Sequence, residues 1–135
     1  MFLIAAALLA LIAFNLSAAT VRLNDKTFNV LVADTPEKQR QGLSGMDGLE
    51  PAQGMIFVNE SPSKSCFWMK DMKFNIDILW FDRDNRLTDQ QRDLSPSTYP
   101  ESFCPRVGAK YVLEVPAGIA QLLHLKTGDK IEVNL

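Results

Sequence analysis

Apolar and polar residues alternate in short runs along most of the chain, which is the pattern of half-buried β-strands. The strongest strand signal is Ile76–Phe81, which is apolar except for Asp77. Because successive side chains of a strand point to opposite faces, Asp77 is expected to share a face with Leu79 and Phe81. Further strands are predicted at 20–23, 27–33, 54–58, 65–70, 86–93, 110–115 and 130–133, the first two joined as a hairpin by the turn at Asn24-Asp25.

Two short helices are predicted between these strands. Thr35 can cap the first one, Pro36 suits the first helical position, and Glu37 complements the positive end of the helix dipole. This helix is expected to end near Leu43, because glycines follow at 42, 45 and 48. The second helix is expected to open at residues 116–118 and to end near 123.

These elements define the fold class. About eight short strands with two brief helices predict a mainly β fold, either a β-sandwich or a barrel-like sheet. Pro62 is predicted to lie in a turn, and residues 95–108, which contain three prolines, are predicted to form a loop. No repeat, linker or low-complexity segment interrupts the pattern. We therefore expect one compact domain at residues 20–135.

Residues 1–19 differ from the rest of the chain. They carry no charged side chain, and residues 2–14 form a nearly unbroken apolar run. Ser17 and Ala19 fit the small-x-small pattern before a signal-peptidase cut, which would leave Thr20 as the new N-terminus. The run lacks a preceding Lys or Arg, so an uncleaved membrane anchor is the alternative. Either way we expect an extracytoplasmic protein, periplasmic or secreted, with the membrane involved only through this segment.

The charge balance excludes one class of partner. The chain has 14 Lys and Arg against 16 Asp and Glu, and no block of like charge occurs. A nucleic-acid footprint needs clustered basic residues, so no nucleic-acid partner is expected.

Two cysteines, Cys66 and Cys104, are the next chemical feature. An even cysteine count in an exported chain favours a disulfide, and closing so long a loop would contribute about 4 kcal/mol in the chain-entropy model. Two separate buried thiols are the alternative. The spacing does not match the CxxC motif of thioredoxin-like redox proteins.

Six segments resemble segments of the DUF192 family and follow one another in the same order as in that family. The most specific is Phe67-Trp68-Met69-Lys70 followed by Asp77; the family commonly continues with Asn-Thr where this chain has Asp71-Met72. The others are 32–37 with 40–43, 54–58, 77–82, 112–118 and 128–129. The resemblance covers nearly the whole of 20–135. It implies a compact β fold with frequent export or membrane association, and it implies no activity, cofactor or catalytic residue.

Trp68 and Lys70 are the first candidate ligand-binding residues. They fall on one face of the predicted strand 65–70, where an indole beside an ammonium group could hold a ring-bearing, polar or cationic ligand. The alternative is that Trp68 packs in the core beside Cys66 while Lys70 extends to the solvent.

Asp77 and Glu114 are the second pair of candidates, because each interrupts an apolar strand. A buried carboxylate needs partners, and burial raises its pKa. Asp77 is therefore either a general acid or base, or a structural group paired with Lys70, Arg40 or a loop. If the two acids shared a cleft about 5–10 Å apart, they could act as a hydrolase pair.

No cofactor or metal is expected. A single histidine does not make a zinc site, and the scattered methionines are typical core residues rather than a copper site. The preferred interpretation is a non-catalytic extracytoplasmic module that binds a small molecule, a glycan or an envelope protein. A hydrolase with paired carboxylates and a structural role in the cell envelope are the alternatives.

Overall fold

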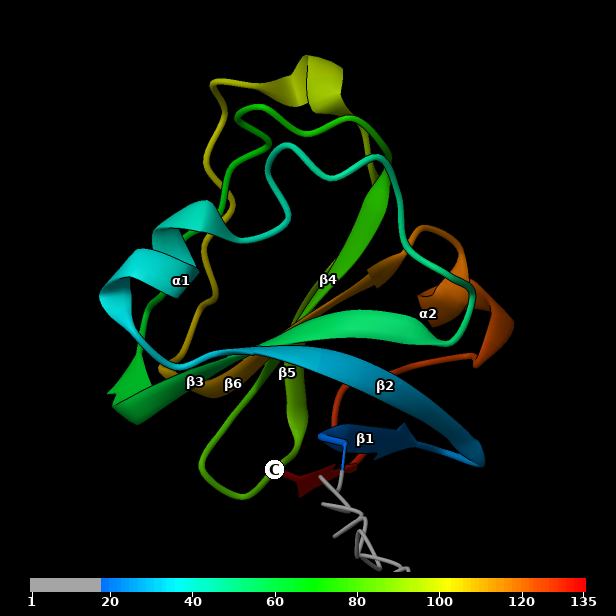
Figure 1. Cartoon of the computed structure of the whole chain (residues 1–135). Coiled ribbons are helices and arrows are strands. Elements are labelled where there is room, and N and C mark those ends of the chain that lie inside the picture. Colours follow the sequence, from blue (N-terminus) through cyan, green and yellow to red (C-terminus); the bar gives the residue numbers. More distant parts are fainter. Residues whose placement is uncertain (1–17) are drawn as a thin grey trace, which may run out of the picture.

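The computed structural model describes residues 18–135 and contains a single seven-stranded sheet with the order β5-β4-β6-β3-β2-β1-β7 (Figure 1). Its elements are β1 (Thr20–Leu23), β2 (Lys26–Ala33), α1 (Pro36–Gln41), β3 (Gln53–Ser63), β4 (Ile76–Phe81), β5 (Leu87–Leu94), the 3-10 turn η1 (Pro96–Thr98), β6 (Ala109–Pro116), α2 (Ile119–Leu122) and β7 (Ile131–Asn134). The predicted leader lies outside the described residues, apart from its last two positions.

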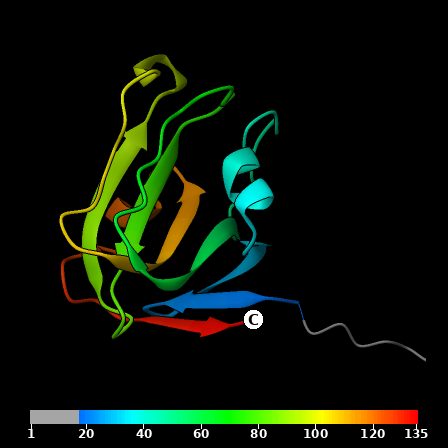
Figure 2. The same ribbon diagram turned by 90° about the vertical axis from the view of Figure 1, so that its left-hand side faces the viewer.

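The sheet curls so that its two edge strands approach each other. A bridge between Arg86 and Lys130 links the start of β5 to the start of β7, and the Leu87 N–H donates to the Asp129 carbonyl at 2.8 Å. The mainly β, single-domain prediction is confirmed, in its barrel-like form. The described chain begins and ends side by side, since Thr20 pairs with Asn134 (Figure 2).

Both faces of the central strands are covered, which explains why β4 is apolar on both faces except at Asp77. The side enclosed by the curl holds the barrel core, formed by Val21, Leu23, Phe28, Ile56, Leu79, Phe81, Leu87, Leu113, Val115, Ile119, Ala120, Leu125 and Ile131. The opposite side holds the outer core, formed by Ala33, Leu43, Met55, Phe57, Met69, Ile76, Ile78, Trp80, Leu94, Ala109 and Val112. All six residues of β4 are buried between the two cores.

Helix α1 begins as predicted. The Thr35 hydroxyl accepts from the Lys38 N–H, and Pro36 opens the helix. The helix ends at Gln41, slightly earlier than predicted, because Gly42 adopts a positive φ of 49° that favours glycine. Since α1 connects the parallel strands β2 and β3, it must cross over one face of the sheet, and it lies on the outer face.

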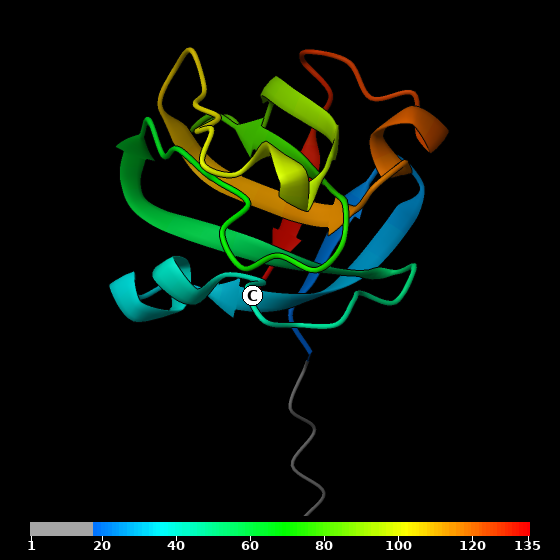
Figure 3. The same ribbon diagram turned by 90° about the horizontal axis from the view of Figure 1, so that it is seen from above.

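Two strand predictions were wrong. Segment 65–70 is a loop with one bridge, Phe67 to Phe103, because it crosses above the sheet instead of pairing within it (Figure 3). Strand β3 runs past 58 to Ser63 and contains Pro62, which had been expected in a turn. The register of β3 with β6 shifts between Val58 and Ser63, and in such an irregular stretch proline breaks no ladder.

A disulfide joins Cys66 and Cys104, which are 38 positions apart, so the predicted bridge is present. It ties residues 64–75, which form the crossing segment, to the loop 95–108, and both cover the outer core (Figure 3). The Trp80 Nε1–H also donates to the Ser65 carbonyl at 3.0 Å, which anchors the crossing segment to β4. Beside α1, the outer layer is therefore loop structure held by a covalent bond and a few specific contacts.

Candidate functional site

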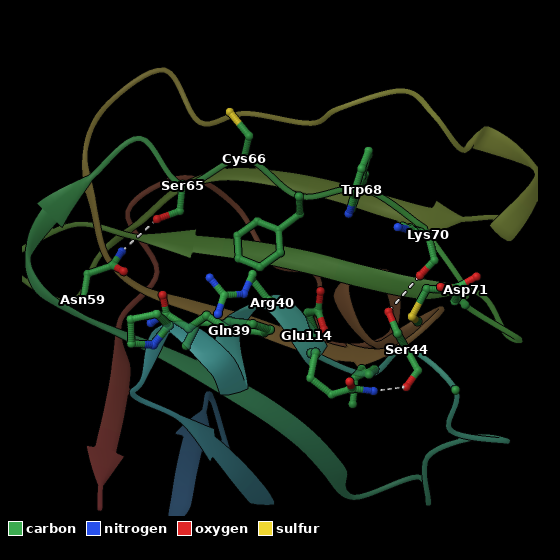
Figure 4. Close-up of a pocket in the computed structure, with 18 residues that line it drawn as sticks. Gln39, Arg40, Ser44, Asn59, Ser65, Cys66, Trp68, Lys70, Asp71 and Glu114 are labelled. Atoms are coloured by element: carbon green, nitrogen blue, oxygen red, sulfur yellow. Dashed lines mark hydrogen bonds between the residues drawn. The ribbon is translucent and has the colours of Figure 1, made fainter.

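A pocket of about 740 Å³ opens on the outer face, between α1 with the turn after it and the crossing segment (Figure 4). Its apolar lining includes Leu43, Phe57, Phe67, Trp68 and Met72. Its polar lining includes Gln39, Arg40, Ser44, Asn59, Lys70, Asp71 and Glu114. A volume of this size admits a small organic molecule.

Hydrogen bonds hold the two walls of the pocket in place. The Ser44 hydroxyl donates to the Lys70 carbonyl at 2.8 Å, and the Gly45 N–H donates to the Asp71 carbonyl at 3.0 Å (Figure 4). Asp71 has a positive φ of 56°, an uncommon conformation that this contact helps to maintain. At the other end the Asn59 amide donates to the Ser65 hydroxyl at 3.0 Å.

Helix α1 is fixed to the sheet by one side chain. The Gln39 amide donates to the Ala33 carbonyl at 3.2 Å and to the Val58 carbonyl at 3.0 Å, so it bonds to the end of β2 and to the middle of β3. A Cβ added at Gly42 would lie 3.5 Å from the Phe57 ring, so the turn after α1 lies close against the pocket lining. This wall is therefore defined by local sequence together with contacts to the sheet.

Glu114 lies in the middle of the pocket lining and is 5% exposed. It extends from β6, where it pairs with Met55 of β3 and Ile78 of β4, both apolar and buried. Among the described residues, its Oε2 is the single buried side-chain oxygen or nitrogen without a hydrogen-bond partner. Burial raises the pKa of Glu114 to about 8, so the side chain is mostly a neutral acid at pH 7.

Trp68 and Lys70 lie at the mouth of this pocket (Figure 4). Trp68 is 49% exposed, so the alternative that it packs in the core is wrong. Its indole contacts the Tyr99 ring at a centroid distance of 5.3 Å, and the Lys70 ammonium lies 5.6 Å from its ring centroid. The alternation expected of a strand persists in the loop, since Met69 is buried while its two neighbours are exposed.

Asp77 is fully buried but lies on the other face of the sheet. It pairs across the ladder with Val115, and Glu114 pairs with Ile78, so the two carboxyl groups point in opposite directions. The hydrolase pair formed by Asp77 and Glu114 is therefore wrong. Asp77 accepts from the Asp93 N–H and from the Ala120 N–H, each at 2.8 Å.

The predicted salt bridge of Asp77 to Lys70 or Arg40 is likewise wrong. Arg40 instead lies 3.8 Å from Glu37 of its own helix, with both side chains about three-quarters exposed. The other prediction for Asp77, hydrogen bonds to a loop, is confirmed: its partners are the N–H groups at the end of β5 and in the first turn of α2. Asp77 is thus a structural group that supplies two backbone donors with an acceptor.

Sequence reasoning found the mouth and the buried acid of this pocket separately, but it missed the opposite wall. Gln39 and Ser44 were assigned only to a helix and its end, and Arg40 was considered only as a partner of Asp77, because nothing in their pattern shows which segment crosses above them. Among residues 18–135, no cluster of three or more His, Cys, Asp or Glu side chains is placed to hold a metal ion. Over the same residues, no helix is long and apolar enough to cross a membrane.

Comparisons with known proteins agree with this fold. Residues 19–133 match the model of DUF192, described as an uncharacterised family. Curated relatives are UPF0127 proteins of Thermococcus sibiricus (29% identical, 78% of this chain and 66% of the relative) and Thermococcus kodakarensis (28% identical, 76% and 62%). The match spans less than two thirds of the length of these relatives.

Two solved structures have the same fold. One is a protein of unknown function from Novosphingobium aromaticivorans, with a TM-score of 0.77, 30% identity, and coverage of 85% of this chain and 83% of that chain. The other, from Sinorhizobium meliloti, is described as a candidate transcription regulator and has a TM-score of 0.78, 24% identity, and coverage of 85% and 91%. At that identity the second likeness shows the fold alone.

Proposed function

The chain belongs to the DUF192 family, whose description assigns no activity, and from that premise we propose that it is a non-catalytic extracytoplasmic module that binds a small organic molecule. The binding site in this proposal is the pocket between α1 and the crossing segment. Glu114 forms its polar floor, and Trp68 and Lys70 form its mouth.

The observation that carries the proposal is the unpartnered carboxyl oxygen of Glu114. A buried polar atom without a hydrogen bond lowers the stability of the fold by about 1–3 kcal/mol. On the opposite face of the same sheet, each carboxyl oxygen of the buried Asp77 accepts a backbone N–H. An acceptor left open inside a pocket is consistent with a ligand that supplies the missing donor.

Trp68 and Lys70 support the same site. A half-exposed indole is a good surface for a flat or apolar ligand body, and it is held in place by contacts with Tyr99 and Lys70. The walls around it are tied by the disulfide and by the bonds from Ser44 and Gly45. A pre-formed site of this kind binds with a small entropy loss.

A binding role is favoured over hydrolysis by the chemistry of the lining. Asp77, the expected second carboxylate, is on the other side of the sheet. Cys66 lines the pocket but is bonded to Cys104, and its side chain points away from the pocket (Figure 4). The sole histidine of the chain, His124, is not part of the lining.

The extracytoplasmic part of the proposal rests on two features. The apolar run at residues 2–14 resembles a signal peptide or anchor, and disulfides persist mainly in oxidising compartments. Fractionation of cells that express the full chain tests this part. Recovery of the protein in the cytoplasm with both thiols free would contradict it.

The binding role is tested by a fragment screen on the isotopically labelled chain, read from backbone amide shifts. Compounds with positive, neutral and negative groups are included. We expect compounds that bind to shift the amide signals of residues 39–45 and 65–72. Trp68→Ala should weaken their affinity about tenfold while the fold stays intact. Leu122→Ala, at an exposed position on α2, is the matched control. Shifts confined to other surfaces, or none, would overturn the proposed pocket function.

A further inference from the structure

We propose that the ligand carries a cationic nitrogen, in an ammonium, amidinium or guanidinium group, which binds the Glu114 carboxylate at the floor of the pocket while an apolar body packs on the aromatic lining. This inference rests on the proposed function and names the chemical class of the ligand. It is argued from three features of the pocket.

The first feature is the missing donor at Glu114. Its Oε2 accepts no hydrogen bond, and its ladder neighbours Met55 and Ile78 are apolar. A carboxylate in such a place is stabilised by an opposite charge that also donates hydrogen bonds. Ammonium and amidinium groups meet both requirements, whereas a hydroxyl meets only one.

The second feature is the aromatic lining. Phe57, Phe67 and Trp68 all line the pocket, and the Phe57 and Phe67 rings meet edge to face with centroids 4.8 Å apart. Aromatic faces attract organic cations. The Lys70 ammonium lies 5.6 Å from the Trp68 centroid, so one cation of the protein already occupies this kind of position.

The third feature is the charge around Glu114 from each surrounding element. Strands β3 and β4 present apolar residues to it. Helix α1 contributes Arg40 to the lining, and the crossing segment contributes Lys70 and Asp71. All three are exposed at the rim, where solvent and salt screen their effect on the buried Glu114. A second positive charge at the outer end of the ligand would lie beside Arg40 and Lys70, with only Asp71 to offset them. A single cationic group is therefore expected.

Binding of such a ligand is linked to proton release. Burial raises the pKa of Glu114 to about 8, and a bound cation stabilises the ionised form. Below that pH the carboxyl must lose its proton before the cation binds. The affinity should therefore rise about tenfold from pH 6 to pH 7 and level off above pH 8.

The experiment compares three probes of nearly equal shape: benzamidinium, neutral benzamide and anionic benzoate. Each is titrated into the labelled chain at pH 6, 7 and 8, and dissociation constants are taken from the amide shifts of the pocket. At pH 8 we expect benzamidinium to bind at least tenfold more tightly than benzamide, with benzoate weakest. Its affinity should rise with pH while that of benzamide stays constant.

Glu114→Gln keeps the size of the side chain and removes its charge. It should abolish both the preference for benzamidinium and the pH dependence, and Leu122→Ala should keep both. If Glu114→Gln does not fold, the pH series on the unaltered chain still tests the inference. If benzamide or benzoate binds in the pocket as tightly as benzamidinium or more tightly, the inference of a cationic ligand is wrong, whereas the proposed pocket function is still supported. A preference that survives Glu114→Gln would also overturn it.

If none of the three probes shifts pocket amides, the cation inference fails. The fragment screen then decides separately on the pocket function, because its neutral and anionic members do not depend on Glu114 being ionised.

Discussion

Asp77 and Glu114 lie on adjacent strands, one pairing step apart, and both are buried, yet they face opposite sides of the sheet. Asp77 faces the barrel core and accepts two backbone N–H groups at 2.8 Å. Glu114 faces the outer core and has an oxygen without a partner. The same residue class in the same sequence setting thus completes the fold on one face and leaves an open acceptor on the other.

The two faces also differ in what covers them. The barrel core is closed by strands and α2. The outer core is covered by α1 and two loops, which are held by a disulfide. A site that must admit a ligand belongs on the second kind of face, because loops tolerate irregular backbone and polar side chains.

The largest effect is expected from breaking the disulfide. Replacing Cys66 and Cys104 by alanine should lower the free energy of unfolding by about 4 kcal/mol, because the bond closes a 38-residue separation. Urea unfolding with and without reductant measures it. The double variant should be insensitive to reductant. A loss below about 1 kcal/mol would show that the outer layer does not depend on this link.

Asp77→Ala is expected to come next, with a loss of about 3 kcal/mol, because two backbone N–H groups, that of Ala120 fully buried, lose their acceptor. Asp77→Asn should lose about half as much, since its amide oxygen still accepts one of them. Asp84→Ala, at an exposed turn position, is the control. If Asp77→Ala is as stable as this control, the structural role assigned to Asp77 is wrong.

Glu114→Met should have the opposite sign. Removing an unpartnered buried carboxyl in favour of an apolar side chain of similar length should raise the free energy of unfolding by about 2 kcal/mol at pH 7. Thermal and urea unfolding at one pH measure this. Destabilisation comparable to that of Asp77→Ala would mean that Glu114 has a partner within the fold.

The pH dependence of stability follows from the same residue. The pKa of Glu114 is raised from 4.5 to about 8 in the folded chain, so the folded state binds the proton more tightly than the unfolded state. Its contribution to stability is fully present below about pH 4.5 and is lost as the pH rises toward 8. From pH 6 to 7 the loss is at most about 1.4 kcal/mol. The free energy of unfolding is measured against pH for the unaltered chain and for Glu114→Gln, and the difference between the two slopes gives the contribution of Glu114. Equal slopes would contradict a raised pKa of Glu114.

Trp68→Ala should have the smallest effect on stability, within about 1 kcal/mol, because the indole is half exposed and touches mainly Tyr99 and Lys70. Differential scanning calorimetry measures this effect. Trp80→Ala, which removes a buried indole from β4, is the contrasting variant and should lose about 3–5 kcal/mol. Similar losses of stability for the two variants would show that Trp68 packs in the core.

Local patterns predicted much of this fold. The apolar run of β4, the cap at Thr35 with Pro36, and the pairing of Cys66 with Cys104 all depend on neighbouring residues or on cysteine count, and each is present. The segment 65–70 was predicted as a strand because its alternation is genuine. What the pattern lacks is the identity of the partner: the segment meets the loop 95–108 at one bridge only, so a ladder cannot form.

The site was predictable only in pieces. Glu114 and Asp77 produce the same signal, an acid in an apolar strand. Their difference arises from strand order, because β6 is inserted between β3 and β4 and its register turns Glu114 away from Asp77. The exposure of Trp68 depends on the crossing segment lying above the sheet. Such long-range arrangements are not encoded in any short window.

The most direct test is a carbon-13 NMR titration of the Glu114 carboxyl, assigned by the signal that Glu114→Gln lacks. We predict a midpoint near pH 8 in the free protein and a clear downward shift when benzamidinium is added. A midpoint near 4.5, unchanged by benzamidinium, would contradict both the unpartnered acid at the floor of the pocket and the ligand class assigned to it.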